Sequence, residues 1–167
     1  MLFAAGAIIA QLAPFTSGVV SGPVGEFRDA AEGPLLGGNL ALLAAVCGTR
    51  YQPDTRGAVL FLEDVAEPLY RVDRMLMQLR LAGLLDDIAG IAFGEFTAMP
   101  DPLHRAEDTG DGCLEDVLHE LIADLGVPAV LGLPFGHGHE NWTLPLGIRA
   151  RLDAAAATLH LLEPAVA

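Results

Sequence analysis

In the middle of the chain an unbroken apolar run ends in two acids: Ala58-Val59-Leu60-Phe61-Leu62-Glu63-Asp64. A short run without polar alternation predicts a strand buried on both faces, which is typical of parallel sheets covered by helices. Sites in α/β proteins lie beyond the carboxyl ends of such strands, where a carboxylate is rigidly held. Either acid could therefore orient a histidine as the acid of a catalytic triad does, or it could simply cap the strand or the next helix.

Amphipathic helices and further strands are predicted on both sides of this run. Helical periodicity covers residues 40–47, 71–82 and 114–125, and Asn39 is a suitable N-cap for the first of them. Further strands are expected at residues 90–94, 127–133, 143–153 and 156–162, the last two as a hairpin around Asp153. This alternation predicts an α/β fold with a partly parallel sheet, flanking helices and a C-terminal β-hairpin. Residues 14–38, rich in glycine and proline, are interpreted as an irregular arm or linker.

Composition sets limits on the class of protein. The 167 residues are 52% apolar and 19% charged, which is a globular composition sufficient for one domain with a core. A net charge of −13 argues against a nucleic-acid partner and an anionic membrane surface, since both require basic patches. The apolar residues 1–10 are too few to span a membrane. Cys47 and Cys113 predict no disulfide, so a cytoplasmic location is expected.

The second stretch whose side chains could take part in catalysis or metal binding is the loop Gly136-His137-Gly138-His139-Glu140, which follows a predicted strand. His137 is a candidate general base, which would need a carboxylate on one ring nitrogen and a nucleophile on the other side. His137 and His139 could instead chelate a metal with Glu140, although such a site needs at least one further ligand. A histidine in a surface loop without function is the remaining alternative.

Other polar groups give weaker signals. Glu95 ends a predicted strand as Glu63 does, but a solvated strand end is the simpler interpretation. The acidic residues 107–112 lack the carboxylate spacing of an EF-hand and are expected to form a solvated turn. Neither serine of the chain, Ser17 or Ser21, follows a strand in the tight turn that exposes a nucleophile.

Five ordered blocks of the sequence resemble the C-terminal domain of the LD-carboxypeptidases, also called muramoyltetrapeptide carboxypeptidases. The resemblance extends from about residue 34 to residue 153 and is specific because the blocks occur in order. The blocks are Gly37-Gly38-Asn39-Leu40, Phe61-Leu62-Glu63-Asp64-Val65, Tyr70-Arg71-Val72-Asp73-Arg74-Met75-Leu76, Gly90-Ile91-Ala92-Phe93-Gly94-Glu95-Phe96, and Gly136-His137 with Pro145-Leu146-Gly147.

The resemblance implies a cytoplasmic serine peptidase of cell-wall recycling, commonly a homodimer. The family cleaves a terminal D-amino acid from L,D-peptides of peptidoglycan, with a Ser-Glu-His triad and no metal or organic cofactor. By motif match Glu63 is the acid of the triad and His137 is its base, whereas His139 occupies a variable position.

The serine of the family lies in a Gly-x-Ser-Asp turn of a separate N-terminal domain, and this chain contains no such turn. Residues 6–12 resemble the last conserved stretch of that domain. We therefore expect residues 1–36 to be a remnant of the N-terminal domain with a linker, and residues 37–167 to be the C-terminal domain. The chain alone is expected to be inactive, with the serine-bearing domain missing or on a separate chain. The alternatives are a split or degenerate domain that binds a peptide or partner without catalysis, and a metalloenzyme that uses His137 and His139.

Overall fold

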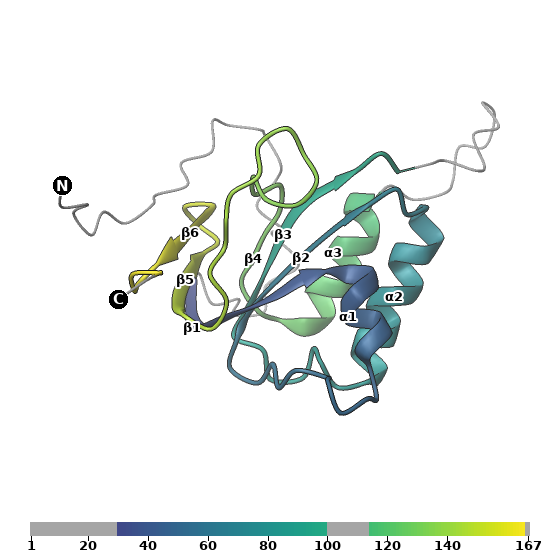
Figure 1. Cartoon of the computed structure of the whole chain (residues 1–167), viewed down its shortest axis with the longest axis horizontal. Helices are drawn as coiled ribbons and strands as arrows, with labels where there is room; N and C mark the ends of the chain where they lie inside the picture. The colour runs from purple at the N-terminus through teal and green to yellow at the C-terminus, as the bar shows by residue number, and fades with distance from the viewer. Residues whose placement is uncertain (1–29, 100–113, 166–167) are drawn as a thin grey trace.

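The computed structural model describes residues 30–99 and 114–165 of the chain. These residues form a six-stranded sheet with three helices, and Figure 1 shows all three helices on one side of the sheet. The elements are β1 (Ala30–Asn39), α1 (Leu40–Val46), β2 (Val59–Val65), α2 (Leu69–Leu81), β3 (Gly90–Thr97), α3 (Leu114–Leu125), β4 (Ala129–Val130), β5 (Arg149–Asp153) and β6 (Thr158–Leu161).

The strand order is β4-β3-β2-β1-β5-β6. Strands β1 to β4 run parallel, and β5 and β6 add an antiparallel hairpin beside β1. The predicted α/β class, the partly parallel sheet and the C-terminal hairpin are therefore confirmed. None of the helices in these two ranges is long and apolar enough to cross a membrane.

Strand β2 lies near the centre of the sheet and separates two apolar clusters. Leu60 and Leu62 point toward the helices and pack with Leu76 of α2 and Leu118 of α3. Phe61 points to the opposite face, on which none of the three described helices lies (the helix-free face), because successive side chains of a strand alternate. This alternation also sends Glu63 to the helix-free face and Asp64 toward α1.

The interpretation of residues 14–38 as an irregular arm is wrong for residues 30–38. These residues belong to β1, which pairs with β2 on one side and β5 on the other. A Cβ atom at Gly37 would collide with the backbone carbonyl oxygen of Phe61, so glycine allows the close approach of β1 to β2. Glycine and proline therefore indicated a loop from the sequence, although here glycine serves strand packing. Residues 1–29 lie outside the described part, so their assignment as a domain remnant stays a prediction.

Two predicted strands are shorter than expected. The strand predicted at 127–133 is reduced to β4, and the strand predicted at 143–153 is reduced to β5. The chain between them crosses the helix-free face, where Leu133 and Phe135 are buried against Phe61. Burial by packing across a sheet face produces an apolar pattern that cannot be distinguished from a buried strand by sequence.

Candidate active site

Glu63 is the third residue from the carboxyl end of β2, so it lies within the strand and not after it. It is paired in register with Asn39, the last residue of β1. On the other side the register between β2 and β3 shifts between Leu62 and Asp64. Irregularities of this kind re-aim side chains and are common next to active sites. The side chain of Glu63 is only 9% exposed.

His137 is brought to Glu63 by the loop that follows β4. The N–H of Leu133 donates to the carbonyl of Phe93 at 3.0 Å, and the N–H of Glu95 donates to the carbonyl of Phe135 at 3.0 Å. The Phe135 ring packs edge-on against Phe61, with ring centroids 5.4 Å apart. These contacts fasten the loop to β3 and β2 just before the histidine.

The Nδ1 atom of His137 lies 2.7 Å from Oε2 of Glu63. An ionised carboxylate can only accept hydrogen bonds, so with Glu63 ionised the proton is on Nδ1, and in the neutral imidazole Nε2 is then left as an acceptor. Half of the His137 side chain is exposed, whereas the Glu63 side chain is buried. The acid is thus held behind the ring, and the ring remains open to a reacting group.

Gly136 makes this approach possible. Its φ is +112°, a conformation that side chains other than glycine rarely adopt. A Cβ atom there would lie 2.8 Å from Oε2 and 2.9 Å from Cβ of Glu63. The Gly-His pair is therefore a steric requirement of the site: glycine makes room for the carboxylate that the next residue binds.

The space beside the pair is a pocket of about 280 Å³ on the helix-free face. Aromatic and aliphatic side chains line it beside the carboxylate and the imidazole. The lining residues are Gly38, Phe61, Glu63, Phe135, Gly136, His137, Asn141, Trp142 and Leu144. Asn141 also braces the turn, because its Oδ1 accepts a hydrogen bond from the N–H of Gly136 at 3.3 Å. Trp142 was not predicted from the sequence as part of the pocket lining; its position in the same loop as His137 was the available signal.

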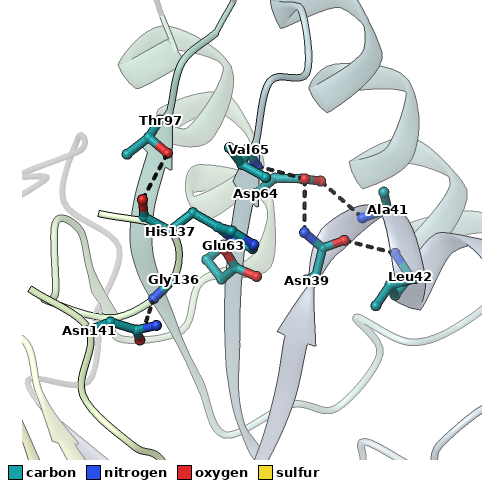
Figure 2. A network of polar contacts seen from close by, with 10 residues as sticks. All are labelled: Asn39, Ala41, Leu42, Glu63, Asp64, Val65, Thr97, Gly136, His137 and Asn141. Atoms are coloured by element: carbon teal, nitrogen blue, oxygen red, sulfur yellow. Dashed lines mark hydrogen bonds and ion pairs between the residues drawn. The ribbon is translucent and has the colours of Figure 1, made fainter. Parts of the chain in front are cut away.

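The other candidate residues lie elsewhere or face other partners. His139 and Glu140 are exposed, and within residues 30–99 and 114–165 no three metal-binding side chains come together. The carboxylate of Glu95 packs against the backbone of Gly138, so Glu95 borders the histidine loop. Figure 2 shows Glu63 beside His137, with Asp64 directed away from them toward Asn39 and Ala41. Ser17, Ser21 and residues 107–112 lie outside the described residues.

Comparison with known proteins identifies the family of the chain. The family described as "LD-carboxypeptidase C-terminal domain" matches residues 32–152, so the chain belongs to the LD-carboxypeptidase family through this domain. The murein tetrapeptide carboxypeptidase of Pseudomonas aeruginosa is 38% identical over 133 residues, which are 78% of this chain and 41% of that protein. The "Probable murein peptide carboxypeptidase" of Bacillus subtilis is 41% identical over 128 residues, 77% of this chain and 39% of that protein.

A solved structure shows the same fold. The muramoyltetrapeptide carboxypeptidase from Oxalobacter formigenes superimposes with a TM-score of 0.69 at 40% identity, covering 79% of this chain and 45% of that one. The chain thus spans about two fifths of the curated relatives named above.

Proposed function

We propose that this chain supplies the general base and the orienting acid of a serine-type LD-carboxypeptidase that acts on murein peptides. The observation that carries the proposal is the 2.7 Å contact between Nδ1 of His137 and Oε2 of Glu63. A buried carboxylate fixes the tautomer and orientation of an imidazole and stabilises the imidazolium that forms during catalysis. The names of the relatives support a murein peptide as substrate, and we place the reaction in the cytoplasm.

In this mechanism Nε2 of His137 takes the proton from a serine hydroxyl as the serine attacks the scissile carbonyl. The same proton then passes to the nitrogen of the departing D-amino acid, and water repeats the sequence to release the peptide. Glu63 keeps its negative charge throughout and holds Nδ1–H. The serine would come from a Gly-x-Ser-Asp turn outside these 167 residues, because the chain itself contains none.

The test is a chimera in which the serine-bearing domain of the P. aeruginosa relative is fused to residues 30–167 of this chain. Release of D-alanine from an L,D-tetrapeptide is measured for the chimera and for the 167-residue chain alone. We expect release from the chimera only. His137→Gln should lower kcat by about four to six orders of magnitude, as loss of a triad member does.

His139→Gln is the matched control, since it removes an exposed histidine two residues away. It should leave kcat within about threefold of the parent chimera, because a surface substitution of this kind has little effect. Equal rates for the His137 and His139 variants, or a folded chimera that releases no D-alanine, would contradict the proposal.

A further inference from the structure

Asp64 is a buried carboxylate that the mechanism above does not use. It is 3% exposed, although acids are rarely buried unless they are hydrogen-bonded. Its Oδ1 accepts from Nδ2 of Asn39 at 2.9 Å and from the N–H of Val65 at 2.8 Å. Its Oδ2 accepts from the N–H of Ala41 at 3.0 Å. One carboxylate thus joins the ends of β1 and β2 to the first turn of α1 (Figure 2).

This junction lies beside the residue that binds His137. Asn39 is both a hydrogen-bond partner of Asp64 and the register partner of Glu63. On the β3 side the register shifts between Leu62 and Asp64 and resumes at Asp64 and Phe96, so Glu63 itself has no register partner on β3. The contacts of Asp64 therefore add to the register pairing of Glu63 with Asn39 in fixing the backbone of β2 on the β1 side.

We propose that Asp64 is a positioning residue that holds Glu63 at hydrogen-bonding distance from His137, a role that rests on the proposed function of that pair. Glu63 and Asp64 are neighbours in one strand and point to opposite faces. Asp64 is anchored on the helix side, and Glu63 is presented on the pocket side. The acid pair thus has divided roles: one carboxylate orients the imidazole, and the other carboxylate fixes the strand that carries it.

Asp64→Asn tests the role with almost no change in volume. An amide offers one oxygen and one NH₂, but the three groups around Asp64 are all donors. In either orientation the new NH₂ faces a donor, so at least one contact becomes repulsive. Asn39→Ser is the milder variant: serine can still cap α1 at the N–H of Leu42, but it lacks the Nδ2 that reaches Asp64.

The readout is the Nδ1–H proton of His137 in NMR spectra of the 167-residue chain, with its chemical shift and its exchange rate with water. Loss of a hydrogen bond to a charged group corresponds to about tenfold or more in an equilibrium. We therefore expect exchange about tenfold faster in Asp64→Asn, and a smaller increase in Asn39→Ser. Thr55→Val is the matched structural control. Thr55 is 2% exposed and donates to the carbonyl of Leu84 at 2.7 Å. Neither residue lines the pocket.

Thr55→Val should lower the melting temperature and leave the His137 proton unchanged. If Asp64→Asn also leaves it unchanged, or acts no more strongly than Thr55→Val, the positioning role is refuted. If Asp64→Asn does not fold, Asn39→Ser decides by the same comparison with Thr55→Val. Glu63→Gln separates the two proposals, because an unchanged His137 signal in that variant would refute the Glu63–His137 pair itself.

Discussion

Replacing Gly136 by alanine tests whether the Gly-His pair is a steric requirement of the site. The φ of +112° would be strained for alanine, and its Cβ atom would lie 2.9 Å from Cβ of Glu63. That neighbouring atom is next to the backbone, so the clash cannot be relieved by rotation of a flexible chain end. Movement of either the loop or β2 would have to relieve it, and both movements separate His137 from Glu63.

The magnitude follows from two contributions to the free energy of unfolding. A strained backbone conformation costs about 1–3 kcal/mol, and overpacking of a well-packed site costs a further 1–3 kcal/mol or so. Gly136→Ala should therefore lower the free energy of unfolding by about 2–6 kcal/mol. Gly147→Ala is the matched control: its φ is +82°, but a Cβ atom there meets nothing within 4 Å, so only the backbone contribution is expected.

Urea denaturation of both variants, followed by circular dichroism, measures the difference through the midpoint at constant m. We expect Gly136→Ala to be less stable than Gly147→Ala by at least about 1 kcal/mol. The NMR signal of the Nδ1–H proton of His137 should be lost in Gly136→Ala and kept in Gly147→Ala. If the two alanine variants are equally stable and both keep that proton, the steric reasoning about Gly136 is refuted.

Two further predictions concern groups outside the pocket. Hydrogen bonds from the side chain and backbone of Arg56 lower the pKa of Asp54 from its ordinary 3.8 to about 2; because the folded-state value is depressed, this stabilisation is present above pH of about 4 and is lost as the pH falls through about 2. NMR titration of Asp54 should show this value, and Arg56→Gln should return it toward 3.8; an unchanged titration would refute the cause. Burial raises the pKa of the Cys47 thiol, so in a Cys113→Ser background iodoacetamide should react with Cys47 more slowly than with a short cysteine peptide at pH 8. Unfolding in urea should remove the difference, and equal rates in the folded protein would contradict it.

Most elements were predictable because their patterns are local. The helices α2 and α3 have apolar residues at helical spacing, and α1 begins where Asn39 caps it by accepting from the N–H of Leu42 at 3.1 Å. Strand β2 was evident from its unbroken apolar run. Strand β1 was not, because its glycines and Pro34 resemble a linker until the neighbouring strands are known.

The site shows the same division. Glu63 and His137 were named from their motifs, 74 residues apart in the chain. Their contact depends on the parallel order of β2 and β3 and on a loop that Phe135 fastens to Phe61. The catalytic assignment of the two residues remains a proposal, and the hydrogen bond between them is what the fold adds to it.

Local patterns of side chains were enough to establish the α/β class, the helices and the family. Periodicity, helix caps and motifs each depend on residues that are close together in the chain. The functions of Gly37, Asp64 and Gly136 emerged only in the folded chain. Gly37 leaves room for a backbone carbonyl of β2, and Gly136 leaves room for the carboxylate of Glu63. Asp64 accepts hydrogen bonds from residues of β1 and α1. Each role is a close contact between residues distant in sequence, and such contacts are set by the packing of strands, which no local pattern contains.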